Sequence, residues 1–379
     1  MLKKIFKMTA LLIGGIILLL FLIGFLFMNL APDFGGTITN KHKEYFSKSP
    51  NYNNGKFINL GGVEMTMGFS KVVEMTVGFF KQQPNTVPDK SIPVEKIDST
   101  EVAGYASPAP RLIWFGHSAF LLQIEGKNIL IDPMFGDVPA PHPLLGGSRF
   151  SKSMPIEIEQ LPHIDAIIYS HDHYDHLDYG SVMKLKDKVE AFYVPLGLGV
   201  HLEAWGIEHD RITELDWWDE TTHDGLQLIC TPAQHFSGRG LTDRGATLWA
   251  SWVIKSDSTN IYFSGDSGYG GHFKEIGEKY GPFDFAMLEC GQYNQLWIEI
   301  HMMPEETAQA AVDLKANLMM PIHWGAFKLA MHSWTDPVER VTKKAKELGV
   351  KVATPKIGEE IVLGDSASYP KEIWWETIQ

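Results

Sequence analysis

The chain has 379 residues, of which 44% are hydrophobic and 21% are charged, and this composition is typical of a folded globular protein rather than a disordered one. The net charge is −13, and because the first thirty residues hold three lysines and no acidic residue, the remainder holds 30 basic against 46 acidic residues. A body this acidic has no general electrostatic attraction for nucleic acid, which argues against a nuclease. Cys230 and Cys290 form neither a CxxC pair nor a disulfide framework.

The N-terminus predicts a membrane segment. Residues 1–7 contain Lys3, Lys4 and Lys7, and residues 8–30 contain no charged side chain. About 20 apolar residues span a bilayer as a helix, whereas the core of a signal peptide is shorter and ends in small residues at a cleavage site. We therefore predict an uncleaved, single-pass signal anchor over 8–30, with a cleaved signal peptide as the alternative. The positive-inside rule then places 1–7 in the cytoplasm and the following domain outside it.

Residues 31–105 are expected to form an extension and linker. They contain a short internal repeat, VEMTMGFSK at 63–71 and VEMTVGFFK at 73–81. Two copies are too few for a solenoid, so we interpret them as a local duplication that packs on the domain or on lipid. The stretch QQPNTVPDKSIPVEK, which is rich in proline and polar residues, reads as an extended linker.

Residues 106–379 predict one compact domain of the α/β (α+β layered) class. Apolar runs on either side of 125–127 and of 256–260 predict two hairpins. Further strands are expected in DAIIYS, EAFYVPLG, LQLICTPAQH, FDFAMLEC and LMMPIHWG, and helices in GSVMKLKDKVE, HFKEIGEKYG, PEETAQAAVDLKA and PVERVTKKAKELG. This order suggests two sheets with helices outside them. The tryptophans of the tail, Trp374 and Trp375, suit either the core or a membrane interface.

The segment SHDHYDHLD, residues 170–178, predicts a metal site. In an extended chain His171 and His173 point the same way and can bind one metal, while Asp175 and His176 follow a turn and can face a second. Histidine nitrogens and carboxylate oxygens are zinc ligands, and packing them together without a cation would cost solvation and repulsion. His235, Asp266 and His323 follow other apolar strands and are further candidates. The other histidines singled out are expected to be structural: His42, His142, His163, His201, His209, His223, His272 and His332.

These residues carry a family resemblance. SHDHYDHLD resembles the H-x-H-x-D-H motif of the metallo-β-lactamase superfamily. The runs GHSAF, TPAQHFSGR, LWASW, FSGDSGY, IHMMPEE and IHWGAF are similar to the branch of N-acyl-phosphatidylethanolamine-hydrolysing phospholipase D and its bacterial relatives. The resemblance covers about 111–364 and implies an αββα metallo-β-lactamase-like sandwich with its metals at one sheet edge.

The resemblance also implies roles for single residues. It assigns His171, His173 and His235 to a first zinc, Asp175, His176 and His323 to a second, and Asp266 to both. Iron and manganese suit the same ligands. His301 in IHMMPEE matches a histidine near the reacting phosphate, and Asp132 in IDP is expected to hydrogen-bond a ligand imidazole. His117 in GHSAF stays open between a structural and a substrate-facing role. The chain departs from the branch in LECGQYNQLW, which brings Glu289, Cys290 and Gln292 near the pocket.

The function implied is a membrane-anchored dinuclear zinc hydrolase, a phosphodiesterase of phospholipase D type that acts on N-acyl-phosphatidylethanolamine-like membrane lipids. A metal-bridging hydroxide attacks phosphorus, Asp266 orients it and receives its proton, and His301 either donates to an oxygen of the substrate or stabilises the charge on it. Asp175, a ligand of the second metal, is the third residue expected to be catalytic. One alternative is a lactonase or another carboxyl-ester or amide hydrolase, in which the hydroxide attacks carbon. Another, from a different class, is a non-catalytic membrane-anchored metal-binding scaffold. A structural zinc site is usually closed at four ligands, so the shared and open positions here favour catalysis.

Overall fold

The structure is a computed structural model that describes residues 2–64, 68–81, 83–364 and 369–378. The α-helices are α1 (Leu2–Leu30), α2 (Asn40–Phe46), α3 (Phe69–Phe80), α4 (Ser99–Ala103), α5 (Tyr179–Leu185), α6 (Gly199–Ala204), α7 (His272–Lys279), α8 (Pro304–Asp313) and α9 (Asp336–Leu348). The strands are β1 (Tyr52–Asn53), β2 (Lys56–Phe57), β3 (Arg111–Trp114), β4 (Phe120–Ile124), β5 (Lys127–Ile131), β6 (Ile164–Ile168), β7 (Val189–Pro195), β8 (Ile212–Leu215), β9 (Glu220–His223), β10 (Leu226–Thr231), β11 (Ser251–Lys255), β12 (Asn260–Phe263), β13 (Phe285–Glu289), β14 (Met319–Ile322) and β15 (Glu360–Val362).

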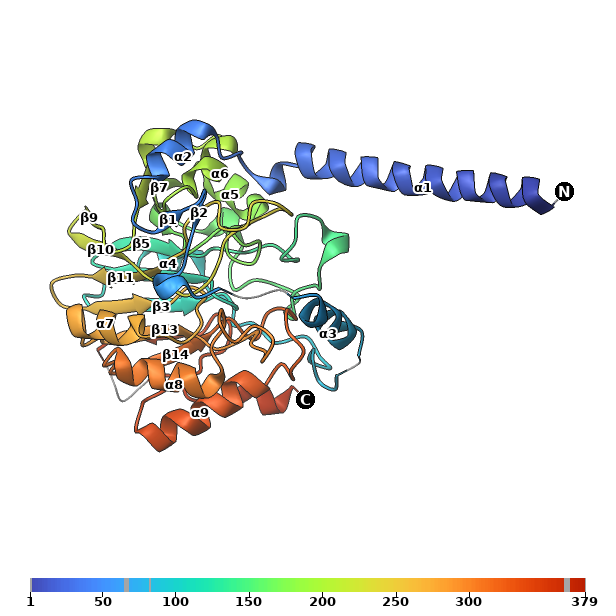
Figure 1. The fold of residues 1–379 in the computed structure, drawn as a ribbon. Helices are drawn as coiled ribbons and strands as arrows, with labels where there is room; N and C mark the ends of the chain where they lie inside the picture. The colour runs from blue at the N-terminus through green and yellow to red at the C-terminus, as the bar shows by residue number, and fades with distance from the viewer. Residues whose placement is uncertain (1, 65–67, 82, 365–368, 379) are drawn as a thin grey trace.

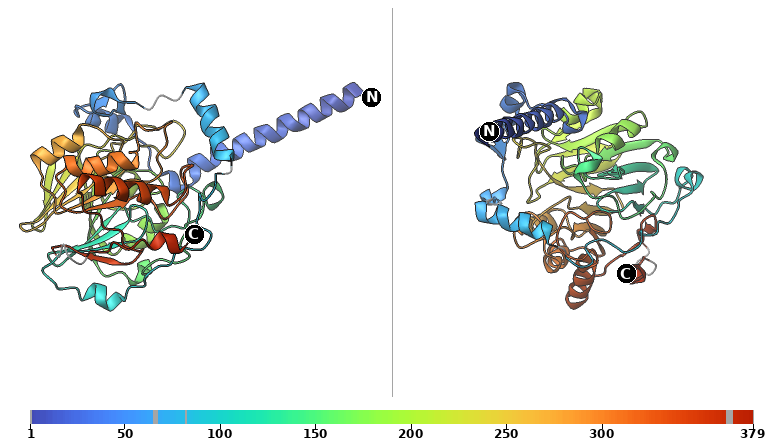
Figure 2. Two further views of the ribbon diagram at one scale, coloured as in Figure 1. Left: turned by 90° about the horizontal axis from the view of Figure 1, so that it is seen from below. Right: turned by 90° about the vertical axis from the view of Figure 1, so that its right-hand side faces the viewer.

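Two mixed sheets pack face to face and carry helices on their outer faces (Figures 1 and 2). One sheet has the strand order β15-β3-β4-β5-β6-β7-β8, and the other has the order β14-β13-β12-β11-β10-β9. The αββα sandwich implied by the sequence resemblance is therefore confirmed. Both predicted hairpins are present, since β4 pairs antiparallel with β5 and β11 pairs antiparallel with β12.

The core follows from the alternation of side chains along each strand. In β4, Leu122 points into the cluster between the sheets, whereas its neighbour Leu121 packs beneath α5 and α6. In β10, Leu228 points inward, and Ile229 packs in the outer cluster that α7, α8 and α9 cover. Both faces of each sheet are thus buried, which is why the strands read as continuous apolar runs.

Helix α1 projects away from the sandwich (Figure 1). Within residues 3–30, the most apolar stretch of 18 residues has a mean hydropathy of 3.0, and none of that stretch is buried. By length and composition this helix can cross a membrane, and a signal sequence near an N-terminus meets the same criterion.

The segment 31–105 packs against the sandwich at several points. Phe46, Phe57 and Ile92 are buried in the cluster between the sheets. The second copy of the repeat lies mostly in α3, while the first copy includes residues 65–67, which lie outside the described residues. The tail tryptophans also join the core, because the rings of Trp374 and Trp375 lie 5.4 and 5.7 Å from that of Trp324.

Glu214 in β8 gives the fold a pH-dependent contact. The backbone N–H groups of Gly197 and Gly199 donate to its Oε1 at 3.0 and 2.9 Å. Burial raises the pKa of Glu214 to about 7, although these two donors oppose the rise. A carboxyl whose pKa is higher in the folded state contributes stability at low pH, and that contribution is lost as the pH rises through the folded-state pKa.

We therefore expect the free energy of unfolding of Glu214→Gln, taken relative to that of the wild type, to increase from pH 5 to pH 8 by at most about 3 kcal/mol. The measurement is the free energy of unfolding in detergent at both pH values. Glu190→Gln, at an exposed position of β7, is the control and should show no such trend. Parallel pH profiles for the wild type and Glu214→Gln would contradict the assignment.

Candidate metal centre

The predicted ligands meet at one edge of the sandwich, because each follows the end of a strand. The segment 170–178 follows β6, and His235, Asp266 and His323 follow β10, β12 and β14. Strands β12, β13 and β14 are parallel, as are β5, β6 and β7, so their carboxyl ends lie at the same edge of their sheets. All seven predicted ligands occur in clusters whose candidate ligand atoms lie within 4.8 Å of one another.

His171, His173 and His235 form the first group. His173 Nδ1 lies 2.9 Å from His171 Nε2 and 3.1 Å from His235 Nε2. Asp266 Oδ2 lies 3.8 Å from His171 Nε2 and 3.7 Å from His235 Nε2. Three imidazole nitrogens and one carboxylate oxygen thus converge, which is the donor set of a tetrahedral zinc site.

Asp175, His176 and His323 form the second group. Asp175 Oδ2 lies 3.6 Å from His176 Nε2 and 3.1 Å from His323 Nε2. Asp266 reaches this group too, with Oδ1 3.2 Å from His176 Nε2 and Oδ2 3.2 Å from His323 Nε2. Asp266 therefore contacts histidines of both groups, as a bridging carboxylate must.

Hydrogen bonds behind the cluster orient its histidines. Asp132 Oδ2 lies 2.7 Å from His176 Nδ1, as expected from the sequence, and Asp132 also accepts from Ser170. Ser170 Oγ lies 2.9 Å from His171 Nδ1, and the carbonyl of Ile300 lies 3.0 Å from His235 Nδ1. Each of these three rings is anchored through Nδ1, which leaves Nε2 for the centre of the cluster.

The charges of the cluster fit bound cations. Burial, followed by neighbouring histidines, lowers the pKa of His171 well below its usual value, so its Nε2 lone pair is free at neutral pH. Burial alone would also lower the pKa of His323, but the carboxylates, led by Asp266, raise it to about 10. Among the described residues, His176 Nε2 and Asp266 Oδ1 are buried without a hydrogen-bond partner. A divalent cation would accept the buried nitrogen lone pairs and neutralise the buried carboxylates.

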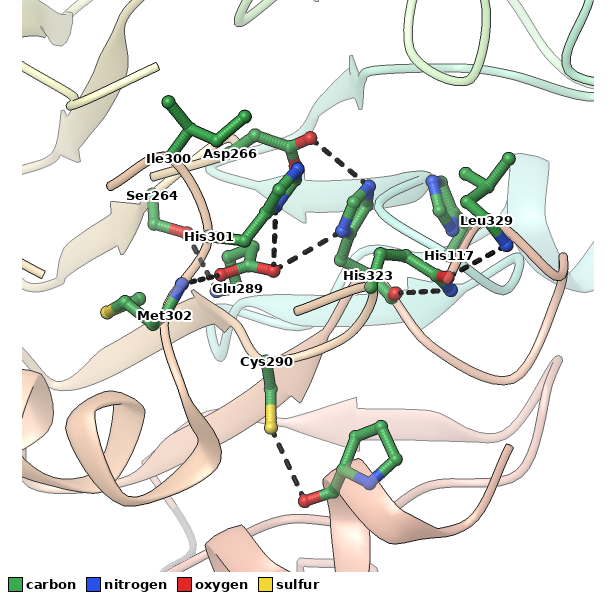
Figure 3. Close-up of polar contacts among 12 residues, drawn as sticks. His117, Ser264, Asp266, Glu289, Cys290, Ile300, His301, Met302, His323 and Leu329 are labelled. Atoms are coloured by element: carbon green, nitrogen blue, oxygen red, sulfur yellow. Dashed lines mark hydrogen bonds and ion pairs between the residues drawn. The ribbon is translucent and has the colours of Figure 1, made fainter. Parts of the chain in front are cut away.

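A cavity of about 250 Å³ opens beside the cluster. Asp175, Asp266 and His301 line it together with apolar side chains from Met75 of α3 and from Trp297. His301 is 12% exposed in its side chain, and its Nδ1 lies 3.2 Å from Glu289 Oε1 (Figure 3). The structure thus brings His301 to the mouth of the predicted metal site.

His117 does not line this cavity. It is fully buried, and its Nε2 lies 2.9 Å from Asp175 Oδ2, within the same cluster as the second group. Its carbonyl accepts from His323 N, so it also holds the backbone of that ligand. Burial, followed by His323, lowers the pKa of His117 to about 3, so the imidazole is neutral.

Residues 288–297, where the sequence departs from the phospholipase branch, contain three side chains with different surroundings. Gln292 lines the cavity and spans the loop after His323, donating to the carbonyl of Phe327 and accepting from the N–H of Leu329. Cys290 points away from the cluster, because its Sγ contacts the carbonyl of Pro337 (Figure 3). Glu289 points into it, and its neighbours are described below.

Two supports of the cluster were not singled out from the sequence. Asn59, from the segment that reads as an extension, accepts from His235 N at 3.0 Å and donates to His235 O at 2.9 Å. Asp172, between the first two histidines, faces the other way and accepts from Gly238 N and from Thr247. The period-2 alternation explains the direction of Asp172, but the loop that it holds is known only from the tertiary structure.

Comparisons with known proteins agree with this geometry. A family model described as a beta-lactamase superfamily domain matches residues 127–324. An uncharacterized protein of Mycobacterium tuberculosis is 40% identical over 336 residues, 86% of this chain and 88% of that protein. N-acyl-phosphatidylethanolamine-hydrolyzing phospholipase D 1 of Caenorhabditis elegans is 32% identical over 286 residues, 72% of this chain and 80% of that protein.

The fold is similar to that of isothiocyanate hydrolase from Delia radicum gut bacteria, with a TM-score of 0.53. The two sequences are 22% identical over 67% of this chain and 99% of the other, so this likeness concerns the fold alone. The arrangement of two stacked sheets is thus shared with that hydrolase. The chain therefore belongs to the metallo-β-lactamase superfamily, and its homologues include N-acyl-phosphatidylethanolamine-hydrolysing phospholipases D.

Proposed function

We propose that the protein is a membrane-anchored dinuclear zinc phosphodiesterase that hydrolyses N-acyl-phosphatidylethanolamine-like phospholipids to a phosphatidic acid and an N-acylethanolamine. The names of the relatives from Caenorhabditis elegans and Saccharomyces cerevisiae support this reaction. The membrane-compatible helix α1 supports it further, because an uncleaved anchor would keep the domain, on the extracytoplasmic side, beside its substrate.

The observation that carries the proposal is that two unlike cavities meet at a metal ligand. His235 and Phe236 line both of them. The first, of about 250 Å³, has apolar walls that include Trp297 and Ile300. The second, of about 440 Å³, is lined by polar and apolar side chains alike, and these include the cationic Lys56 and Arg244. An apolar cavity at the cluster that adjoins a cavity with two cationic side chains suits an amphiphilic substrate with a charged head group.

The residues of the two groups would hold one ion each, with Asp266 shared between them. Two divalent ions there would supply an activated water and neutralise charge on the phosphate. Asp266 orients the attacking water and accepts its proton at a carboxylate oxygen, while Asp175 keeps the second group in place. In its doubly protonated form His301 donates the Nε2 hydrogen to the leaving oxygen and keeps the Nδ1 hydrogen toward Glu289, so that water adds to phosphorus and the alcohol leaves neutral.

The test is to incubate the zinc-loaded full-length protein in mixed micelles with N-acyl-phosphatidylethanolamine, with plain phospholipids and with a simple lactone. Mass spectrometry would follow phosphatidic acid and the released head group. Phosphatidic acid formation that requires Asp266 supports the proposal. Hydrolysis of the lactone alone would move the function to the carboxyl-ester reading, and metal binding without turnover of any substrate would leave a metal-binding scaffold.

Arg244 gives a prediction about substrate binding. Its guanidinium lies 3.8 Å from the centroid of the Phe236 ring, at the boundary between the two cavities. Burial lowers its pKa, but arginine keeps its charge at neutral pH. If the polar head group binds there, Arg244→Gln should raise KM about 10-fold and change kcat little, because a charge-assisted hydrogen bond is lost in ground state and transition state alike.

Initial rates over a range of lipid mole fractions in the micelle would measure this change. The matched control is Arg211→Gln, which removes an ion pair with Glu208 and hydrogen bonds to the carbonyls of Lys186 and Val189, away from both cavities. Equal KM values for the wild type and Arg244→Gln would place the head group elsewhere.

A further inference from the structure

Glu289 is a buried carboxylate directly behind the metal cluster. It ends β13, and its backbone pairs in parallel register with Ile322 of β14, so it lies beside the strand end that carries His323. Its N–H donates to Ser264 Oγ, and its carbonyl accepts from Thr307 of α8. Its side chain is fully buried, so the position of the carboxylate is set by these two strands and by α8.

The carboxylate faces three donors (Figure 3). Oε2 accepts from the N–H of Met302 at 3.0 Å, and Oε1 lies 3.2 Å from His301 Nδ1 and 3.4 Å from His323 Nδ1. The two rings are nearly parallel, with an interplanar angle of 10° and centroids 5.3 Å apart, and they present the same nitrogen to the same oxygen. Among the described residues, His323 Nδ1 has no hydrogen-bond partner of ordinary geometry, so Glu289 Oε1 is the acceptor that faces it.

Burial of a carboxylate is costly unless donors satisfy it. A neutral imidazole carries one N–H, and here each ring can meet this demand only by placing its hydrogen on Nδ1. Nε2 of His323 is then a bare lone pair, 3.1 Å from Asp175 and 3.2 Å from Asp266. Nε2 of His301 is the ring nitrogen that remains for the cavity, which His301 lines.

We propose that Glu289 is a positioning residue that fixes the tautomer and orientation of two histidines at once, the metal ligand His323 and the pocket residue His301. Through one oxygen it holds His323 Nε2 as a ligand for the second metal and directs His301 Nε2 at the substrate. Metal binding and substrate engagement are thereby set by the same carboxylate. This inference rests on the dinuclear site of the proposed function but is independent of the identity of the substrate.

The test replaces the carboxylate by an amide of the same shape. Glu289→Gln has one acceptor oxygen for three donors, and its own NH₂ opposes an N–H. The metal-free full-length protein in detergent would be titrated with Zn²⁺ against a competing chelator, and with Co²⁺ followed by visible absorption. We expect the affinity of one of the two metals to fall by about 10- to 100-fold and the Co²⁺ spectrum of that site to change.

Glu214→Gln is the matched control, because it makes the same change at a buried glutamate that also accepts backbone N–H groups but lies outside the cluster. It should bind both metals as the wild type does. Wild-type affinity for both metals together with an unchanged Co²⁺ spectrum in Glu289→Gln would overturn the proposal. Because this readout needs no substrate, its result stands even if the phospholipid is not hydrolysed.

A second measurement decides the matter if Glu289→Gln does not fold. Long-range ¹H–¹⁵N spectra of the zinc-loaded wild type with labelled histidine report which ring nitrogen carries the hydrogen, and loss of one signal in His301→Gln assigns that residue. We expect the hydrogen of His301 on Nδ1. A hydrogen on Nε2 of neutral His301 would overturn the proposal.

A third arm uses turnover of a chromogenic phosphodiester, or of the lipid if it is a substrate. If Glu289 acts on activity partly through His301, Glu289→Gln should reduce the turnover rate by a much smaller factor in the His301→Gln variant than in the wild type, both at saturating metal. An equal cost in both backgrounds would refute the link to His301.

Discussion

Replacing Asp266 by asparagine is expected to reduce turnover by at least about 1,000-fold while the protein stays folded. Asp266 is the carboxylate that contacts histidines of both groups, with distances of 3.2 Å to His176 and His323. An asparagine keeps the shape but has one uncharged acceptor, so it can neither bridge two cations nor take a proton from water. The measurement is kcat of the metal-loaded variant, with bound metal counted by elemental analysis.

The control for this variant is Asp165→Asn. Asp165 lies in β6, outside the cluster, and accepts from the N–H of Asn128. It tests whether an aspartate-to-asparagine change in the same sheet system alters activity through the fold alone. Turnover of Asp266→Asn within a few-fold of the wild type, with both metals bound, would sink the catalytic role of Asp266.

Removing the metal should have the second large effect, this time on stability. A ligand at 1,000 times its dissociation constant raises the free energy of unfolding by about 4 kcal/mol per site. Two tightly bound metals would therefore raise it considerably. Without the cations, the buried carboxylates Asp175 and Asp266 are left to neighbouring imidazoles for compensation. Incubation with a strong chelator is therefore expected to lower Tm by several degrees and to abolish activity, as measured by thermal unfolding in detergent.

Adding back Zn²⁺ in excess of the chelator should restore both Tm and activity, whereas Mg²⁺ should not, because the cluster is dominated by imidazole nitrogens. Comparing Zn²⁺, Mn²⁺ and Fe²⁺ in the same assay would rank the metals. An unchanged Tm after the metals have been removed and their loss has been verified would show that the site does not contribute to folding stability.

The apolar N-terminal helix and the other local elements are readable from the sequence because they depend on near neighbours. A charge-free run that is long enough to cross a bilayer indicates α1, and the apolar runs around 125–127 and 256–260 indicate hairpins that the structure confirms. The predicted helix at 180–190 ends at Leu185 in the structure, because the chain re-enters the sheet as β7 at Val189. The short strands β8, β9 and β15 had no clear pattern of their own, since pairing with a neighbour creates them.

The candidate ligand residues could be named from the sequence. H-x-H-x-D-H concentrates metal-binding side chains within a few residues, and His235, Asp266 and His323 each stand directly after a buried strand, where parallel strands bring their ends together. Only the tertiary structure decided which atoms face one another. Asn59, His117 and Glu289 each reach the cluster from a different part of the chain, and each acts through a hydrogen bond or a close polar contact whose partner is many residues away. Such contacts produce no recognisable periodicity or spacing in the sequence. A sequence pattern shows which face of a helix or strand is buried, but not which side chains of distant elements contact that face.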